Sequence, residues 1–390
     1  MVSASKTGAR HQRIKLGMVG GGQGAFIGAV HRIAARIDDQ FELVAGALSS
    51  DPERAKASAA EIGLSEERSY GSFEEMAKAE SARPDGIEAV SIVTPNHMHA
   101  PAAKAFLNAG IHVICDKPLC TSVEEALDLQ KLVRSSGKLF VLTHNYTGYP
   151  MVRQAREMVQ NGDLGTIRLI QVEYPQDWLT EAAERSGSKQ AEWRTDPKRS
   201  GAGGAIGDIG THAYNLAGFV TGLKAEKLLA QLTTFVDGRL LDDDVQIMLR
   251  YQGGARGSLW ASQVAVGNEN GLKLRVYGTK GGLEWTQADP NYLWFTRFGE
   301  AKQLITRAGA GANASAARVS RIPGGHPEGY LEGFATIYTE AAKAINAARS
   351  GEALDPSVIY PTIEDGVDGM RFIEAAVASS RDGNVWRDIG

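Results

Sequence analysis

The first part of the chain alternates short apolar runs with segments in which apolar residues recur at helical spacing. The apolar runs, interpreted as strands, lie at 14–19, 41–48, 87–93, 112–115 and 139–143. The clearest helical segments between them lie at 53–62, 98–109 and 122–135. Near-continuous apolar strands that alternate with helices are typical of a parallel sheet covered on both faces. The pattern therefore predicts a doubly wound α/β domain over residues 14–146.

After about residue 150 the pattern changes to longer strands with short turns. A helix at 151–160 comes first, and strands are expected at 166–174, 227–236, 244–251, 255–263 and 272–277. Glycine turns at 252–254 and 279–282 favour an open, mostly antiparallel sheet. A flexible loop is expected at 308–316, and helices at about 328–349 and 362–380. We predict a second domain over residues 147–390, whose C-terminal helix is a candidate to pack back on the first domain.

Composition excludes several classes of protein. The chain has 390 residues, 43% of them hydrophobic and 23% charged, with a formal net charge of −4. These values fit a soluble globular protein of two or three domains. They leave no broad basic face for nucleic acid. No run approaches the roughly 18 consecutive apolar residues that a membrane helix needs.

The N-terminus and the cysteines bear on the compartment. Residues 1–13 are polar and lack the apolar centre of a secretory signal, so we expect them to be disordered. The two cysteines, Cys115 and Cys120, are too few for a disulfide framework and lack metal-ligand spacing. These features predict a cytoplasmic protein with no metal site, no membrane partner and no nucleic-acid partner.

A glycine-rich segment follows the first strand. Its residues 20–24 read Gly-Gly-Gly-Gln-Gly, and such a loop would let the backbone approach a pyrophosphate at the start of a helix. Gly20 and Gly22 fit the first two positions of the G-x-G-x-x-G fingerprint, but Gly28 fits the third only if the loop carries three extra residues. A plain glycine turn is the alternative. The place of the loop favours dinucleotide binding by Gly20, Gly22, Gln23 and Gly24.

The end of the second strand bears on the choice of cofactor. An acidic residue there would hold the adenine ribose of NAD, but this position is Ser49, and Asp51 two residues later is also suited to cap a helix. Without a carboxylate, a 2′-phosphate would not be repelled, and Ser49, Ser50 and Arg54 could bind it. The sequence therefore leans to NADP and leaves NAD open.

Polar residues also follow the third and fourth strands. Residues 94–99, Thr-Pro-Asn-His-Met-His, stand where an open α/β sheet binds its ligand, although a turn and helix start would explain them equally. The i, i+2 spacing of the two histidines, without an acidic or thiolate partner, argues against a metal. Lys117, between Asp116 and Pro118, is suited to the crevice, where a desolvated lysine can exchange protons with a hydroxyl. The alternative is a surface lysine at a tight turn.

A second candidate for chemistry lies at 203–212, Gly-Gly-Ala-Ile-Gly-Asp-Ile-Gly-Thr-His. If this segment begins a helix, Asp208 and His212 lie at i, i+4 on one face. An acid near a histidine can orient it and favour its protonated form for acid–base work. The alternative is a capping aspartate and a structural histidine.

These motifs together give the chain a family resemblance. The glycine loop, Thr-Pro-Asn-His at 94–97, Asp-Lys-Pro at 116–118 and Gly-Asp-Ile-Gly-Thr-His ending at 212 occur in the order seen in the Gfo/Idh/MocA oxidoreductases. The chain resembles this family, named after glucose–fructose oxidoreductase and inositol dehydrogenase, over nearly its whole length. The resemblance implies a nicotinamide-binding Rossmann domain and a second domain whose open sheet often forms a subunit interface, in a homodimer or homotetramer.

The resemblance also implies roles for residues. Lys117, Asp208 and His212 would be the catalytic lysine, aspartate and acid/base histidine, and Pro118 the proline that is usually cis. Around the cofactor it implies residues from several loops: Gly20, Gly22, Thr94, Pro95, Asn96, His99, Asp116, Lys117 and Asn145. Three positions depart from the family pattern, because Asp116 replaces a glutamate, Thr147 an arginine and Asn215 an aspartate.

The implied reaction is reversible hydride transfer between NAD or NADP and one secondary alcohol carbon of a pyranose sugar, glycoside or inositol. Further residues implied to contact such a ring, beside the catalytic three, are Tyr146, Trp178, Arg194 and His326. Domain packing or helix capping would explain Trp178, Arg194 and His326 equally. Two other functions remain open: redox-neutral glycoside cleavage assisted by NAD, and a sugar or nucleotide sensor without turnover.

Overall fold

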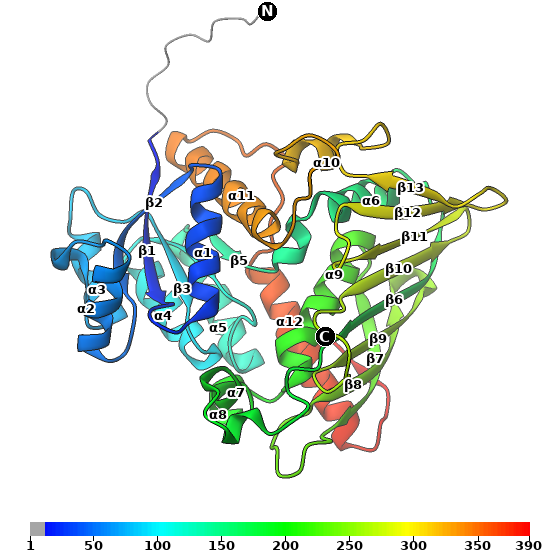
Figure 1. Cartoon of the computed structure of the whole chain (residues 1–390), viewed down its shortest axis with the longest axis horizontal. Helices are drawn as coiled ribbons and strands as arrows, with labels where there is room; N and C mark the ends of the chain where they lie inside the picture. The colour runs from blue at the N-terminus through cyan, green and yellow to red at the C-terminus, as the bar shows by residue number, and fades with distance from the viewer. Residues whose placement is uncertain (1–11) are drawn as a thin grey trace, which may run out of the picture.

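The computed structural model describes residues 12–390, whose strands form two sheets (Figure 1). The expectation of a disordered N-terminus falls on residues 1–11, which lie outside the described residues. The first sheet is parallel, in the order β2-β1-β3-β4-β5. Its strands are β1 (Ile14–Gly20), β2 (Phe41–Ala47), β3 (Ala89–Val93), β4 (His112–Cys115) and β5 (Phe140–Leu142). The connecting helices are α1 (Phe26–Ile37), α2 (Pro52–Glu61), α3 (Phe73–Ser81), α4 (His99–Asn108) and α5 (Val123–Ser136).

Alternate residues of these strands pack on opposite faces of the sheet. In β4, Val113 and Cys115 belong to the core under α4 and α5, while Ile114 belongs to the core under α1. Each strand is therefore buried on both sides, which explains its nearly continuous apolar sequence. The predicted doubly wound α/β fold is confirmed.

The second sheet runs in the order β13-β12-β11-β10-β6-β9-β8-β7-β14. Its strands are β6 (Ile167–Pro175), β7 (Ala225–Thr233), β8 (Asp244–Tyr251), β9 (Arg256–Ser262), β10 (Lys273–Gly278), β11 (Gly281–Thr286), β12 (Tyr292–Arg297), β13 (Gln303–Thr306) and β14 (Arg387–Asp388). Its pairs are antiparallel except for β6 with β9. The predicted antiparallel sheet is confirmed.

Helices cover one face of this second sheet. They are α6 (Pro150–Gln160), α9 (Thr211–Thr221) and α12 (Ile363–Arg381), and Figure 1 shows α9 and α12 between the sheet and the first domain. The other face is open, so residues alternate between buried and exposed along β8. Ile247 and Leu249 are buried, whereas Met248 between them is 57% exposed. This alternation is the usual mark of an antiparallel sheet with one free face.

Two sequence-based expectations in this half need correction. No strand was expected after residue 277, yet β11, β12 and β13 extend the sheet by successive antiparallel pairing. The prediction of a flexible loop over 308–316 is wrong for its last residues, because helix α10 (Ala314–Val319) begins there. The side chain of Asn313 accepts a hydrogen bond from the main-chain N–H of Ala316 and so provides the N-cap that starts this helix.

A helix of the C-terminal half packs against the first sheet. Helix α11 (Tyr330–Ser350) lies on α1, and Phe334 and Ile345 share a core with Ile14 of β1. The hydroxyl of Tyr338 also lies 2.8 Å from Nδ1 of His31 in this core. Neither this helix nor any other among the described residues has the length and apolar composition needed to cross a bilayer. The packing of α11 fixes the two sheets relative to each other.

Buried neutral histidines make the stability of this fold depend on pH. Burial lowers the pKa of His31 to about 4 and that of His144 to about 3, against 6.5 for a free side chain. At pH values between the lowered pKa of the folded protein and 6.5, these histidines bind protons in the unfolded chain but not in the folded chain. The stability of the fold therefore falls as pH falls below about 6.5. Each such histidine contributes about 1.4 kcal/mol per pH unit in that window.

We therefore expect the urea midpoint of unfolding to decrease from pH 7.5 to pH 5. A His31→Asn variant, which cannot titrate at this position, should show a shallower decrease than the wild type. Equal midpoints at the two pH values would contradict the assignment of these histidines as neutral.

Candidate active site

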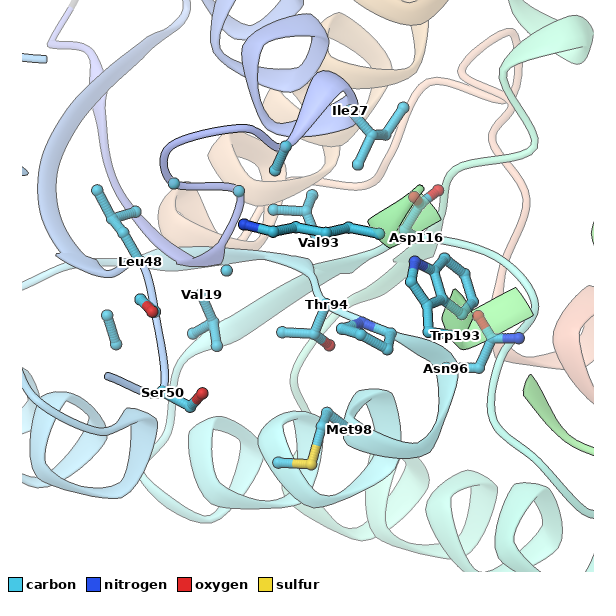
Figure 2. Close-up of a pocket in the computed structure, with 18 of the residues that line it drawn as sticks. Val19, Ile27, Leu48, Ser50, Val93, Thr94, Asn96, Met98, Asp116 and Trp193 are labelled. Carbon is cyan, nitrogen blue, oxygen red and sulfur yellow. The ribbon is translucent and has the colours of Figure 1, made fainter. Parts of the chain in front are cut away.

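A cavity of about 660 Å³ lies at the carboxyl ends of the parallel strands. The glycine loop, the ends of β2, β3 and β4, and the short helix α7 (Lys189–Arg194) line it. Figure 2 shows Leu48 and Ser50 toward one end of this cavity and Asn96, Asp116 and Trp193 toward the other. The cavity is long and spans the point where the strand order reverses, which is where open α/β sheets bind dinucleotides.

The glycine loop has the geometry of a dinucleotide-binding turn. Gly20 and Gly24 have φ near +77°, which favours glycine. A Cβ on Gly22 would lie 2.6 Å from the carbonyl oxygen of Leu48, so a side chain does not fit. A Cβ on Gly28 would lie 2.3 Å from the carbonyl oxygen of Gly21, so Gly28 provides the close helix–strand contact of the third fingerprint glycine. The loop does carry extra residues, and this cradle fits a pyrophosphate.

Gln23 is bonded to helix α2. Its Nε2 donates to Glu61 of α2 at 2.9 Å, and its main-chain N–H donates to Oγ of Ser58 at 3.1 Å. Gln23 lines the cavity, but these two bonds use it to fix the loop on α2. The predicted contact of Gln23 with a cofactor stays a prediction, and Gln23 does line the cavity.

The end of β2 resolves the role of Asp51. Its carboxylate accepts a hydrogen bond of 2.8 Å from the main-chain N–H of Arg54, so it is the N-cap of α2, as the alternative interpretation held. Ser49, Ser50 and Arg54 all line the cavity. Oγ of Ser49 already accepts the N–H of Asp51 at 3.1 Å.

Two residues assigned to the cofactor by sequence, Asn96 and His99, also connect parts of the protein. Nδ2 of Asn96 donates to the carbonyl oxygen of Ser200 at 2.9 Å, although Asn96 also lines the cavity with Thr94 and Pro95. His99 is buried beneath the cavity, and its two ring nitrogens lie 2.7 Å and 2.9 Å from the carbonyl oxygens of Pro118 and Thr94. His99 does not line the cavity, and its ring lies between these two loops, where its one N–H can donate to either carbonyl oxygen.

The lysine is held on the loop that follows β4. The peptide bond between Lys117 and Pro118 is cis, as the resemblance implied. The Asp116 carboxylate accepts the main-chain N–H of Lys117 and the hydroxyl of Thr143, both at 2.9 Å. The short Asp116 side chain therefore fixes the backbone of Lys117. Asn145 lies buried nearby, and it does not line the cavity.

Lys117 forms an ion pair with Asp208 at the wall of the cavity. Nζ of Lys117 lies 3.0 Å from Oδ1 of Asp208, and both side chains are less than one fifth exposed. Asp208 is not in an ordinary helical turn, because residues Ile206–Gly210 form a π-helical turn, a feature common at functional sites. The extra residue in this turn changes the i, i+4 relation that the sequence suggested between Asp208 and His212.

The Asp208 carboxylate has three donors. Beside Lys117, Nε of Arg194 lies 3.2 Å and Nε2 of Gln263 lies 2.8 Å from Oδ2. Burial alone would raise the pKa of this carboxyl, but the positive charges of Lys117 and Arg194 outweigh it and hold the pKa far below its usual value. Asp208 is therefore ionised at neutral pH.

His212 is not paired with Asp208. Its ring packs against Tyr146 and His144, with centroids 4.9 Å and 5.4 Å apart, and its Nδ1 has no hydrogen-bond partner among residues 12–390. Burial, with the charge of Lys117, lowers the pKa of His212 well below 6.5. Asp208 does not orient His212 as predicted, because Lys117, Arg194 and Gln263 take the carboxylate; its charge raises the pKa of His212, but burial and the charge of Lys117 outweigh it, so the protonated form is not favoured. His212 is neutral at pH 7 and can accept a proton.

The four further residues expected at the substrate are not all brought together. Arg194 lines the cavity, with its guanidinium carbon 4.2 Å from the ring centre of Trp193 and 5.9 Å from that of Trp178. Tyr146 lies against His212 but is buried, and its hydroxyl bonds to the hydroxyl of Tyr174. Trp178 is 37% exposed, outside the cavity wall.

His326 is the fourth, and the structure does not bring it to the site. It is exposed on the loop before α11, where its carbonyl oxygen accepts from Arg307. The buried Arg307–Glu328 pair anchors this loop away from the cavity, which is why His326 does not line it. No group of three or more His, Cys, Asp or Glu side chains within residues 12–390 is arranged to hold a metal ion.

Sequence reasoning missed residues that complete the site. Gln263, directly after β9, donates to Asp208, and the carboxylate of Asp242 accepts the main-chain N–H groups of Gly204 and Ile206 at 2.7 Å and 2.9 Å. Burial raises the pKa of Asp242 to about 6. The Gly203-Gly204 pair was the only sequence signal near this anchor, since a Cβ on Gly204 would lie 2.1 Å from the carbonyl oxygen of Asp242.

Comparison with known proteins agrees with this fold and site. Residues 14–144 match the family model described as an oxidoreductase family with an NAD-binding Rossmann fold, and residues 152–284 match the GFO/IDH/MocA C-terminal domain. The fold and the nucleotide cavity thus define an NAD-binding oxidoreductase. The chain belongs to the Gfo/Idh/MocA family, as its sequence motifs suggested.

Three relatives are similar over almost the whole chain. The crystal structure of an oxidoreductase from Sinorhizobium meliloti is 61% identical, with a TM-score of 0.88 over 96% of this chain and 99% of that chain. An inositol dehydrogenase homolog from Azotobacter vinelandii, complexed with NADH and myo-inositol, is 36% identical, with a TM-score of 0.91 over 97% and 98%. The levoglucosan dehydrogenase of Pseudarthrobacter phenanthrenivorans is 28% identical over 97% and 98% of the two chains.

The glycine loop gives a direct test of the cavity. Gly22→Ala places a methyl group 2.6 Å from the Leu48 carbonyl oxygen and from Oγ of Ser58, so the loop must shift. We expect the Kd for NADH, measured by fluorescence titration, to rise at least about 10-fold, because backbone N–H groups of such loops hold the pyrophosphate. Gly369→Ala, at a helical glycine of α12 where an added Cβ meets nothing within 4 Å, is the control. Equal affinities of the Gly22→Ala protein and the wild type would contradict the assignment.

Proposed function

We propose that this protein is a dehydrogenase that oxidises a secondary alcohol carbon of a polyhydroxylated ring, a sugar or a cyclitol, and catalyses the reverse reduction. The observation that carries the proposal is the Lys117–Asp208 ion pair on the wall of the dinucleotide cavity. His212 lies at the start of α9, directly after the π-helical turn that carries Asp208, and is a neutral base. Relatives named for inositol and levoglucosan support a ring polyol as substrate.

The residues have separate roles in the proposed reaction. Lys117 donates a hydrogen bond to the reacting oxygen and stabilises the negative charge that develops on it. His212 takes the hydroxyl proton in the oxidation and returns it in the reduction. Asp208 holds Lys117 in place. A bound nicotinamide ring supplies the hydride acceptor or donor.

Lys117→Ala tests this assignment. Loss of the oxygen-stabilising ammonium group should lower kcat about 10²- to 10⁴-fold, the usual range for such catalytic help. The Kd for NADH should change little. Turnover is measured by nicotinamide absorbance with myo-inositol first, then with a panel of monosaccharides, glycosides and levoglucosan. Lys131→Ala, on the exposed face of α5, is the matched control.

Three results would count against the proposal. Near-normal turnover of the Lys117→Ala protein would overturn the role of the lysine. Product without a net change in absorbance would indicate redox-neutral glycoside cleavage. NADH binding without any turnover across the panel would indicate a sensor.

The cofactor proposed is NAD rather than NADP. The lean to NADP that the sequence gave finds no support, because relatives of known structure carry NAD⁺ or NADH. In this chain Ser49 is already engaged in the turn before α2, and Arg54 is exposed. We expect the Kd for NADH to be at least about 10-fold lower than that for NADPH in parallel fluorescence titrations, a difference of about 1.4 kcal/mol. A lower Kd for NADPH would reverse this choice.

We also propose a homo-oligomer that uses the open face of the second sheet. This face exposes Leu169, Met248, Tyr277, Trp294 and Leu304, each between 38% and 57% exposed. Large apolar side chains exposed on an open sheet face favour an interaction site. Whether the assembly is a dimer or a tetramer is read from its mass in solution by light scattering.

A further inference from the structure

We infer that Gln263 is a positioning residue of this site: its side-chain amide fixes the Asp208 carboxylate, and through it the direction in which Lys117 presents its ammonium group. The inference rests on the proposed function of the Lys117–Asp208 pair. Gln263 lies outside the sequence motifs of the site, 55 residues after Asp208, and is 2% exposed.

The two oxygens of Asp208 have separate partners. Oδ1 accepts from Nζ of Lys117 at 3.0 Å, and Oδ2 accepts from Nε2 of Gln263 at 2.8 Å and from Nε of Arg194 at 3.2 Å. The positions of these three donors together determine the orientation of the carboxylate. Gln263 provides the shortest of these bonds.

The donor is fixed by its own backbone. The main-chain N–H of Gln263 donates to the carbonyl oxygen of Asp243 at 2.8 Å, and its carbonyl oxygen accepts from Leu179 at 3.0 Å. Asp243 is fully buried and forms an ion pair of 3.0 Å with Arg239. Gln263 therefore presents its amide from a rigid segment.

The acceptor is fixed by the neighbouring residue. The Asp242 carboxylate holds the N–H groups of Gly204 and Ile206, and the N–H of Asp208 donates to the carbonyl oxygen of Gly204 at 2.9 Å. Asp242 thus holds the turn that carries Asp208, while Asp243 holds Gln263. Two consecutive residues set the distance between donor and acceptor, so their bond is built into the frame of the second domain.

The chemistry of Arg194 explains why an amide is needed here. A guanidinium group favours two parallel hydrogen bonds to both oxygens of a carboxylate. If Arg194 took both oxygens, Oδ1 would turn away from Lys117. The Gln263 amide shares Oδ2 with Arg194, whose Nη1 donates to Gln190 at 2.6 Å, so Arg194 keeps a single bond to the carboxylate. Because the amide is neutral, it adds no third positive charge beside Lys117 and Arg194.

Gln263→Met tests the role of the donor, because methionine keeps the length and lacks the amide. With myo-inositol and NAD as probes, we expect kcat to fall about 10- to 100-fold, the scale of loss from a misplaced catalytic group. KM for myo-inositol and Kd for NADH should stay within about 2-fold, because Gln263 touches neither. Gln252→Met, the same substitution at an exposed glutamine after β8, is the control and should retain wild-type kcat.

Gln263→Glu tests the same contact through pH. This near-isosteric change puts a second carboxyl beside Asp208, and two close carboxyls cannot both ionise easily. The acid limb of the kcat profile should move to higher pH by at least about 1 unit, with kcat partly restored above that limb. A purely structural role for Gln263 would not move the limb. If the Gln263→Met protein does not fold, the pH profile of the Gln263→Glu protein alone tests the inference.

A crystal structure of the Gln263→Met protein tests the inference without any turnover. The expected result is Arg194 bonded to both oxygens of Asp208, with Oδ1 turned away from Lys117. An unmoved Asp208, together with kcat within 2-fold of the wild type and an unshifted acid limb, would overturn the inference.

If Lys117→Ala is inactive while all Gln263 variants are normal, the inference fails and the proposed function stands. If Lys117→Ala is fully active, the proposed function fails.

Discussion

The site depends on keeping one buried carboxylate ionised. Moving a carboxylate out of water costs several kcal/mol, and that cost is offset only when charged and hydrogen-bonding partners are held at close range. Asp208 obtains these partners from three separate parts of the chain: the loop after β4, helix α7 and the end of β9. Much of the fold can be understood as the means of bringing these three together.

The two sheets divide this task. The parallel sheet forms the dinucleotide cavity and supplies Lys117. The second domain supplies Asp208, Arg194 and Gln263, so the Lys117–Asp208 pair joins the two domains. Hydrogen bonds weaken within a few tenths of an ångström, so the domains need a firm relative position. Helix α11 provides it by adding its apolar face to the core of the first sheet, and the amide of Asn96 adds a bond across to Ser200.

The sequence predicted those features of the structure that depend on residues close together in the chain. The apolar runs gave the parallel sheet, and the glycines gave the cradle, because a missing Cβ is visible in any sequence. The order of the motifs located Lys117, Asp208 and His212. Gln263 had no such signal, because a single amide after a strand looks like any surface residue until the fold places it 2.8 Å from a carboxylate. The pKa of His212 was misjudged for a related reason: burial and Lys117 lower it, and neither is visible in the spacing.

The corrected state of His212 changes how the charges of the site work together. Lys117 and Arg194 carry two positive charges against one negative charge on Asp208, so the cluster has a net charge of +1. Charges act strongly on one another in a buried site, where water screens them little. A net positive charge stabilises an alkoxide more than an alcohol, and it also disfavours a proton on His212, whose ring is already buried. In the proposed reaction this charge favours ionisation of the substrate hydroxyl, while burial and the charge of Lys117 keep His212 neutral and make it a weak base. A histidine that already carried a proton could not accept one from the substrate, so pairing the carboxylate with Lys117, Arg194 and Gln263, which leaves His212 neutral, is consistent with the proposed alcohol oxidation.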